Sequence, residues 1–155
     1  MKRKDASIWD KKAESYARFS HDENSFQSLI LGKIAQRGIS FEQKSVLDIG
    51  CGTGVYTLHL AKHALHVNAL DFSQEMLNIL HEDAIKEGLD KKFTFTCNTW
   101  SDFESDKDFD IVFSSMSPAF ESNADFEKMH AYAREYCVYL GWGGKRESTL
   151  LDPIF

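Results

Sequence analysis

Two hydrophobic patterns divide the chain. Within residues 1–40, the stretches IWDKKAESYARF and SFQSLILGKIAQRG place apolar residues three or four positions apart, which is typical of amphipathic helices. From residue 45 onward, short apolar runs alternate with amphipathic stretches, as in βα units that build a parallel sheet. The patterns therefore predict an α/β protein in which a helical segment precedes the sheet.

The apolar runs predict five strands, with helices between them. The expected strands are residues 45–49, 66–70, 93–97, 109–114 and 137–141, and the expected helices are residues 54–63, 74–87 and 124–135. Ser73 and Asn123 are the expected N-caps of the last two helices, and Gly38 is an expected C-terminal cap. No repeat or Pro/Gly-rich linker divides the chain, so we expect one domain, made of the helical segment 1–40 and the sheet region 41–155.

Composition narrows the classes of partner. With 24 acidic and 18 basic residues, the formal net charge is -6, so we expect neither nucleic acid nor anionic membranes to attract the chain. No apolar stretch is long enough for a membrane span, and no apolar run follows the basic start as in a secretory signal, so a cytoplasmic protein is expected. The three cysteines form no C-x-x-C pair, which favours reduced thiols over disulfides or a zinc site.

Three histidines lie close together but do not predict a metal site. His59 and His63 are four residues apart, on one face of an expected helix, and His66 follows. A zinc protease helix would need a glutamate directly after the first histidine, where Leu60 stands. We therefore expect no metal.

The stretch VLDIGCGTGVY carries the strongest chemical signal. Gly50, Gly52 and Gly54 directly follow the first expected strand, at the carboxyl edge of the sheet where doubly wound folds bind ligands. Glycines there let the backbone bend sharply and approach a ligand closely, and the N-terminus of the next helix would add free N–H groups. The pattern indicates a nucleotide-like site, although a purely structural turn would explain one or two of the glycines.

An acidic residue completes this site. Asp71 ends the second expected strand, 21 residues after Gly50, and neighbouring strand ends lie side by side in a βαβ unit. Its carboxylate is therefore placed to accept hydrogen bonds from both hydroxyls of a ribose. The alternative is an ordinary acidic residue at a strand end.

Two features disfavour a pyrophosphate ligand. The dinucleotide fingerprint would need glycine at position 55 or 57, where Val55 and Thr57 stand, and no lysine follows Gly54 as in a phosphate loop. Asp48, two residues before the first glycine, would repel phosphate but complement an ammonium and a sulfonium. An NAD(P)-dependent or nucleotide-sugar enzyme is therefore the weaker alternative.

These motifs together resemble the class I S-adenosylmethionine-dependent methyltransferases. The resemblance rests on D-I-G-C-G-T-G at 48–54, on Asp71 followed by Phe72, on W-D-K-K-A-E-S-Y at 9–16 and on F-D-I-V at 109–112. It implies a Rossmann-like domain over residues 41–155 and an N-terminal lid over residues 1–40. It also implies S-adenosylmethionine as cofactor, S-adenosylhomocysteine as product, and an unidentified small-molecule acceptor.

The resemblance also implies the residues that bind the cofactor. They are Tyr16, Asp48, Gly50, Cys51, Gly52, Asp71, Phe72, Met76, Asn98, Thr99, Trp100 and Ser114. The acid at 48 and the backbone at 50–52 would hold the methionine part, and the acid at 71 would hold the ribose. Phe72 and Met76 would pack near the adenine. The Asn98 side chain would accept a hydrogen bond from the amino group of the adenine.

The remaining implied roles leave alternatives open. Trp100 would cover the adenine ring or belong to the core, and Ser114 would offer its carbonyl to the ammonium group of the cofactor. Tyr16 and Phe19 would close over the sulfonium or the acceptor, or would simply pack a helix.

No catalytic residue is predicted. The leaving group of methyl transfer is a neutral sulfide that needs no acid, so positioning alone can suffice. S-S-M-S-P-A-F at 114–120 is faintly similar to the [ND]-P-P-[YF] box of amino-group methyltransferases, but Ser117 and Ala119 replace key members, which favours a substrate-facing loop without that chemistry. Tyr16 and His21 are candidate acid/base groups.

The end of the chain differs from the resembled family, whose sheet usually has seven strands with a C-terminal hairpin. After Trp142 only G-G-K-R-E-S-T-L-L-D-P-I-F remains, so we expect a truncated form without that hairpin. The fifth strand would then be an apolar edge, and a homodimer through this edge would be a consequence. A non-catalytic module that only binds the cofactor is the remaining alternative.

Overall fold

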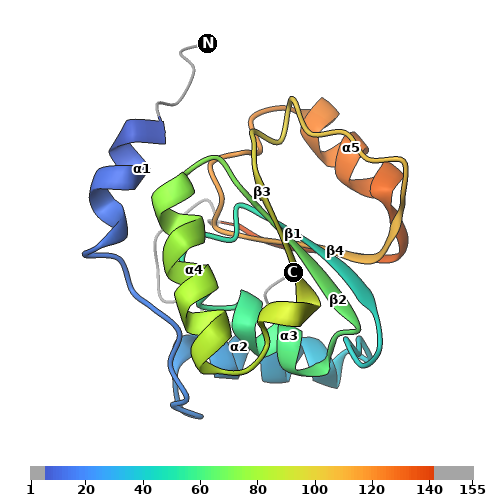
Figure 1. The fold of residues 1–155 in the computed structure, drawn as a ribbon. Coiled ribbons are helices and arrows are strands. Elements are labelled where there is room, and N and C mark those ends of the chain that lie inside the picture. The colour runs from blue at the N-terminus through green and yellow to red at the C-terminus, as the bar shows by residue number, and fades with distance from the viewer. Residues whose placement is uncertain (1–5, 142–155) are drawn as a thin grey trace.

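The computed structural model describes residues 6–141 of the chain, which form one five-stranded parallel sheet with helices on both faces (Figure 1). The strand order is β3-β2-β1-β4-β5. The elements are α1 (Ala6–Ala13), α2 (Phe26–Gln36), β1 (Ser45–Ile49), α3 (Thr57–His63), β2 (His66–Asp71), α4 (Gln74–Lys86), the 3-10 helix η1 (Asp90–Lys92), β3 (Phe93–Cys97), β4 (Phe109–Ser115), α5 (Asn123–Tyr132) and β5 (Ala133–Leu140). The predicted doubly wound parallel sheet is confirmed.

Each face of the sheet has its own apolar core, because alternate strand residues point to opposite faces. Val46 on β1 packs in one cluster with residues of α2, α3 and α4, whereas its neighbour Leu47 packs in the other with Met129 of α5. The strands are apolar on both faces, as expected for a parallel sheet that is covered on both sides.

The first helix is shorter than predicted. α1 ends at Ala13, whereas the periodicity predicted helix to residue 19. The backbone N–H and the hydroxyl of Ser15 both donate to the Lys12 carbonyl, each at 3.1 Å, and close a turn there. Residues 14–25, here called the strap, then run without helix to α2 (Figure 1). Gly38 follows the end of α2 with φ +85°, as the predicted cap requires.

The other boundary errors have local causes. α3 begins at Thr57 rather than 54 because Gly54 has φ +91°, which no right-handed helix accepts. α5 ends at Tyr132 and β5 begins at Ala133, which pairs with Phe109 of β4, so residues 133–135 are strand and not helix. The N-cap of α5 is Ser122 rather than the predicted neighbour at 123.

A polar clamp fixes the amino ends of the central strands. The N–H of Ser45 on β1 donates to the Asp110 carboxylate on β4 at 3.0 Å, and the N–H of Asp110 donates to Oγ of Ser45 at 3.0 Å. Arg134 of β5 donates to the same carboxylate at 3.1 Å. These contacts set the relative register of three strands at the end opposite the carboxyl edge.

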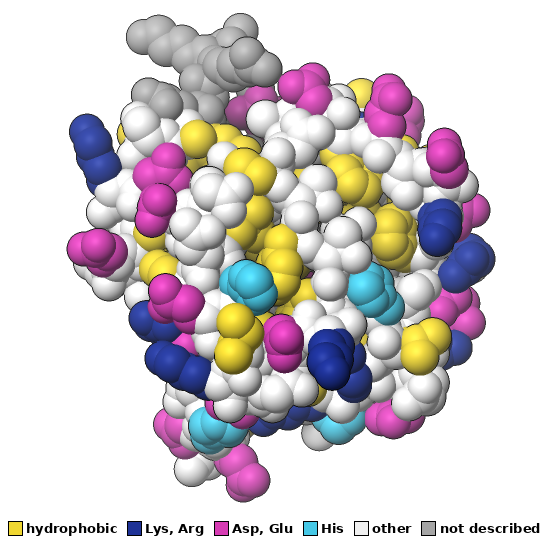
Figure 2. All heavy atoms as spheres, viewed as in Figure 1, with side chains coloured by type: hydrophobic (Ala, Val, Ile, Leu, Met, Phe, Trp, Pro, Cys, Tyr) yellow, Lys and Arg dark blue, Asp and Glu magenta, His cyan; other side chains and the backbone are white. Residues whose placement is uncertain are grey.

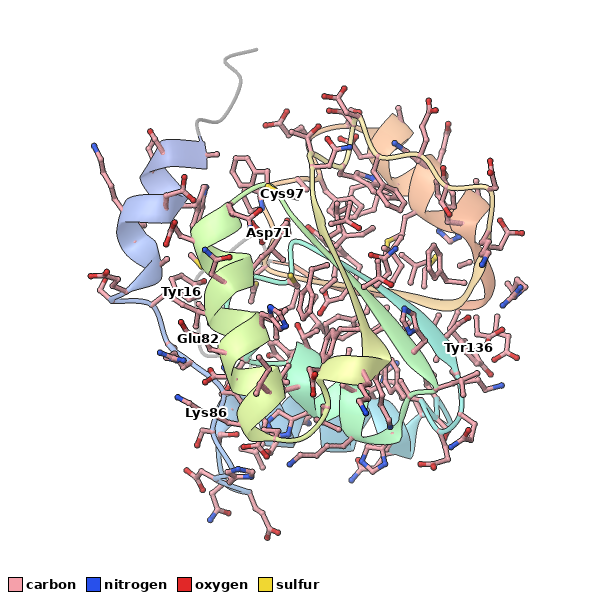
Figure 3. The ribbon with its side chains drawn as sticks, in the orientation of Figure 1. Tyr16, Asp71, Glu82, Lys86, Cys97 and Tyr136 are labelled. Atoms are coloured by element: carbon pink, nitrogen blue, oxygen red, sulfur yellow. The ribbon has the colours of Figure 1, made fainter. Side chains whose placement is uncertain are left out.

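β5 is an edge strand within the described part of the chain. It pairs with β4, and no other strand among residues 6–141 pairs with its outer side. Tyr136 on this strand is 44 % exposed (Figure 3). The expectations of truncation and of a missing hairpin concern residues 142–155, which lie outside the described residues. Over residues 6–141, none of the helices combines the length and apolar character needed to cross a membrane.

Candidate functional site

A cavity of about 450 Å³ opens at the carboxyl edge of the sheet. Residues at the carboxyl ends of β1, β2, β3 and β4 line it, together with side chains of the N-terminal segment. A volume of this size lies in the usual range for small-molecule sites. The fold therefore places a ligand-sized space where the glycine stretch predicted a site.

The bend after β1 forms one wall of the cavity. The N–H groups of Gly50 and Cys51 both donate to the Leu70 carbonyl of β2, at 2.8 and 3.1 Å. Gly50 has φ +71°, and a Cβ built there would lie 2.3 Å from Oγ of Ser117 in the loop after β4. Any side chain at position 50 would therefore collide with this loop, so the glycine lets the two loops meet.

Asp71 connects the glycine bend to the end of β2. Its side chain is almost buried, with the residue 8 % exposed, and it lines the cavity near Cys97 of β3 (Figure 3). One carboxylate oxygen accepts the N–H of Gly52 at 2.8 Å and the other accepts the N–H of Ser73 at 2.9 Å. Burial raises the pKa of this carboxyl, and the backbone donors oppose that shift. The carboxylate therefore lies at the cavity with its orientation fixed by backbone donors.

Three of the predicted cofactor residues lie beneath the lining rather than in it. Asp48 is buried and accepts the hydroxyl of Thr57 at 2.6 Å, and burial raises its pKa to about 7. Cys51 is buried, and this burial raises the pKa of its thiol. Ser114 is buried and its hydroxyl donates to the Ile49 carbonyl at 2.8 Å. Contacts of these residues with the cofactor stay a prediction.

The other predicted cofactor residues share the cavity. These lining residues are Tyr16, Gly50, Gly52, Asp71, Phe72, Met76, Asn98, Thr99 and Trp100. The backbone N–H of Asn98 donates to the Asp71 carbonyl at 3.0 Å, which joins the ends of β2 and β3. Residues predicted from three separate strand ends are thus neighbours in space.

Trp100 belongs to both the core and the cavity. It is 3 % exposed, stacks on Phe103 with ring centroids 5.8 Å apart, and donates its indole N–H to the Asp125 carbonyl at 3.1 Å. It also lines the cavity. The two alternatives of the sequence analysis therefore do not exclude each other, because the packed indole still presents part of its surface to a ligand.

The N-terminal segment contributes two aromatic side chains to the cavity. Trp9 of α1 and Tyr16 line it, with their rings 6.4 Å apart. Phe19 does not line it: its ring centroid lies 4.7 Å from that of His59 on α3, which favours the predicted alternative of packing against a helix. His21 pairs with Glu87 at 2.7 Å outside the cavity, so it is not placed as an acid or base.

Side-chain hydrogen bonds join the strap to α4 and to the glycine bend. Arg18 donates to both carboxylate oxygens of Asp83 on α4, at 2.7 and 3.1 Å. The hydroxyl of Thr53, in the glycine bend, donates to the Ala17 carbonyl. Figure 3 shows Tyr16 beside α4, just before this anchored part of the strap. The strap thus links the bend, α4 and the aromatic side of the cavity.

About half of the lining residues were not among the predicted cofactor-binding residues. The additional lining residues are Trp9, Ile49, Leu70, Ser101, Ser115, Met116, Ser117, Pro118, Ala119 and Glu121. Half of them belong to the loop between β4 and α5, where the stretch at 114–120 predicted a substrate-facing loop. Met116 in this loop has φ +49°, and its N–H donates to the Leu140 carbonyl at 2.7 Å, which no local pattern predicts.

This fold and site define a class of protein: the Rossmann-like domains that bind an adenosine-containing cofactor at the carboxyl ends of parallel strands. Residues 46–141 match the family described as "Methyltransferase domain". The chain belongs to this family, and the resemblance to the class I S-adenosylmethionine-dependent methyltransferases is confirmed.

Relatives and solved structures agree with this placement. The chain is 30% identical over 150 residues to a cypemycin N-terminal methyltransferase of Streptomyces sp, covering 96% of this chain and 58% of the relative. It is 31% identical over 123 residues to phosphoethanolamine N-methyltransferase 1 of Triticum aestivum, covering 70% of this chain and 24% of the relative. The chain therefore spans between a quarter and three fifths of the length of these curated relatives.

Among solved structures, a SAM-dependent methyltransferase from Aquifex aeolicus superimposes with a TM-score of 0.68 at 22% identity, covering 94% of this chain and 77% of that one. A complex of DhpI with S-adenosylhomocysteine gives a TM-score of 0.61 at 25% identity, covering 82% of this chain and 59% of that one.

Proposed function

We propose that the protein is an S-adenosylmethionine-dependent methyltransferase that acts on a small-molecule acceptor. The observation that carries the proposal is the meeting of the glycine bend, Asp71 and Asn98 around one cavity at the carboxyl edge. The family match supports the same cofactor. The two relatives named above act, by their names, on phosphoethanolamine and on the N-terminus of cypemycin, which supports an acceptor outside the nucleic acids.

The residues present fit this cofactor. A Cβ built on Gly52 would have no atom within 4 Å, so the bend leaves open space for a ligand against the backbone. In the proposal, the Asp71 carboxylate accepts the ribose hydroxyls, and Phe72 and Met76 pack against the adenine. The backbone at Gly50 and Gly52 holds the methionine part together with Asp48, which is buried and accepts the hydroxyl of Thr57 at the start of α3.

The cofactor would supply a methyl group activated by its sulfonium, and the chain would supply position. Aligning acceptor and methyl group at ~3 to 3.5 Å is worth about 7 to 11 kcal/mol in effective concentration. A fixed wall of short strand-end loops is suited to this role. We therefore assign no residue of this chain a proton-transfer role that is required for every acceptor.

Titration calorimetry with S-adenosylmethionine and S-adenosylhomocysteine tests the proposal. We expect both to bind, and Asp71→Ala to weaken binding by ~1.5 to 3 kcal/mol, the range for hydrogen bonds to a charged group. Asp90→Ala is the matched control, because Asp90 lies in η1 outside the cavity lining and carries the same charge. Thermal unfolding of both variants separates lost binding from lost folding. An unchanged affinity in the Asp71 variant would refute the ribose assignment.

Two alternatives make different predictions. A nicotinamide or nucleotide-sugar enzyme, disfavoured by Val55, would give saturable binding of NADH in a fluorescence titration. The second alternative is a non-catalytic module. It would bind S-adenosylhomocysteine but transfer no radiolabelled methyl group to cell extracts.

We also propose a cytoplasmic location and association of two copies through the edge of β5. The cysteines at 51, 97 and 137 are free thiols, which suits a reducing compartment.

The exposed Tyr136 on the outer edge of β5 supports pairing there. Analytical ultracentrifugation that gives a monomer at high concentration would contradict the association.

A further inference from the structure

The helix α1 is too short to keep its place through its own stability. It has eight residues, and isolated helices shorter than about 12 residues are marginal in water. Ala13 is the one residue of this helix that is buried. Trp9 of the same helix lines the cavity, and Figure 1 shows α1 beside α4. The position of Trp9 therefore depends on the contacts that α1 makes with α4.

Asp10 supplies a polar contact between these two helices. The hydroxyl of Ser73 donates to the Asp10 carboxylate. The backbone N–H of Glu75 donates to the same carboxylate oxygen at 3.4 Å. Ser73 is the N-cap of α4 and is fully buried. The Asp10 carboxylate thus meets the first turn of α4, where free N–H groups and the helix dipole favour a negative charge.

Ser73 links this contact to the cofactor side of the cavity. Its N–H donates to one oxygen of Asp71 at 2.9 Å, and its hydroxyl accepts the N–H of Met76 at 3.2 Å. Asp71 and Met76 both line the cavity. Hydrogen bonds therefore run without a break from Asp10 on α1 through Ser73 to the carboxylate that we assign to the ribose.

We propose that Asp10 is a positioning residue of the cofactor site. This inference rests on the proposed methyltransferase function. By holding Ser73, the Asp10 carboxylate keeps Trp9 in the cavity wall and fixes the turn that presents the Asp71 carboxylate. A cofactor in the cavity would contact both sides of this bond, so cofactor binding and the docking of α1 reinforce each other. Loss of the bond lowers the fraction of molecules in the binding-competent arrangement, and the apparent affinity falls by the same factor.

Two substitutions at position 10 separate the hydrogen bond from the charge. Asp10→Ala removes both, whereas Asp10→Asn removes the charge but keeps a side-chain oxygen that can accept the Ser73 hydroxyl. Glu14→Ala is the matched control, because Glu14 is exposed, carries the same charge directly after α1 and lies outside the cavity lining. Titration calorimetry measures the affinity of each full-length variant for S-adenosylhomocysteine, and urea unfolding measures its stability.

We expect Asp10→Ala to weaken the binding of S-adenosylhomocysteine about three- to tenfold, the scale of one hydrogen bond. Asp10→Asn should recover most of this affinity, and Glu14→Ala should bind as the wild type does. A contact that serves only the stability of the fold would change urea unfolding and leave these affinities equal. The inference is overturned if Asp10→Ala binds as tightly as the wild type, or if Asp10→Asn loses as much affinity as Asp10→Ala.

A double-mutant cycle tests the link through Ser73. Ser73→Ala removes the hydroxyl that donates to Asp10 and the cap that accepts the N–H of Met76, so it should weaken binding by itself. Adding Asp10→Ala should then cause little further loss of affinity, because the bond is already gone. Full additivity of the two losses would overturn the inference.

Hydrogen exchange gives a second readout of the coupling. S-adenosylhomocysteine should slow exchange in peptides that cover residues 6–13 of the wild type, and should slow it much less in Asp10→Ala. Equal protection in both proteins would overturn the inference while the proposed function stands. Failure of the wild type to bind S-adenosylhomocysteine would overturn the proposed function, and this inference with it.

Discussion

The anchor between Arg18 and Asp83 is expected to control the order of the strap. Arg18→Met keeps the length of the side chain but removes the guanidinium that donates to both oxygens of Asp83. The strap then keeps the bond from Thr53 to the Ala17 carbonyl, the pair of His21 with Glu87 and the ring contact of Phe19 with His59. We expect this variant to open the strap more often without unfolding the sheet.

The magnitude follows from the partial burial of the pair. The Asp83 side chain is 12% exposed and that of Arg18 is 40% exposed, so the loss lies between that of a surface pair and that of a buried one. Lys86, with Nζ 3.9 Å from Asp83, compensates part of the charge that is left. We expect a cost of about 1 to 2 kcal/mol, which makes the open state ~5 to 30 times more populated.

Hydrogen exchange followed by mass spectrometry measures this opening directly. Peptides that cover residues 14–25 should exchange faster in Arg18→Met, while peptides that cover β1 keep the wild-type rate. S-adenosylhomocysteine should bind the variant more weakly, because Tyr16 precedes the anchor and lines the cavity.

Lys86→Met provides the control. Nζ of Lys86 lies 3.9 Å from the same carboxylate, and the Lys86 side chain is 70% exposed. This ion pair joins two residues of α4 and does not involve the strap. Lys86→Met should leave the rate of hydrogen exchange in residues 14–25 unchanged. If Arg18→Met also leaves it unchanged, the ion pair does not hold the strap, and the explanation for its order is wrong.

Two further predictions concern the buried Asp48 and Gly54 of the glycine bend. The pKa of Asp48, about 7, is far above the usual ~4 of an unfolded chain, so the native state binds more protons between these values and the wild type loses stability as pH rises from 4 to 7. Asp48→Asn should remove this pH dependence of the free energy of unfolding, which is worth up to about 4 kcal/mol. Urea unfolding of both proteins across this pH range measures it. Equal pH profiles would contradict the raised pKa of Asp48. Gly54→Ala should cost about 2 to 4 kcal/mol, from its φ of +91° and from a Cβ 2.3 Å from Cδ1 of Leu80. Leu80→Ala in the same chain should cost less than additively, and full additivity in the double-mutant cycle would argue against this contact.

The sequence predicted those parts of the fold that local patterns control. β1 and β3 have the predicted bounds, because short apolar runs and the flanking turns determine them. The glycine bend and Asp71 were found for the same reason: strand ends of a βαβ unit lie together once the topology is right. These features need no information from distant residues.

Features that depend on distant residues were missed. The strap has a helical pattern, but Arg18 is held by α4 and Ala17 by the glycine bend, so tertiary contacts override the local preference. Met116 has φ +49°, a conformation that is uncommon for methionine and is held here by Leu140, 24 positions later. The stretch at 114–120 predicted a substrate-facing loop, but not its conformation, because that depends on β5.

The polar clamp at Ser45, Asp110 and Arg134 divides the molecule into two ends with different tolerance for change. Side chains hold the strands in register at the end away from the cavity, so the opposite end needs no rigid side-chain network of its own to keep the sheet aligned. Acidic and basic side chains are interspersed over the face shown in Figure 2, which is not dominated by either sign. Replacing residues 116–121 with segments of other sequence should therefore alter which molecules are accepted while the scaffold keeps its alignment, which makes this chain a practical starting point for redesigning acceptor choice.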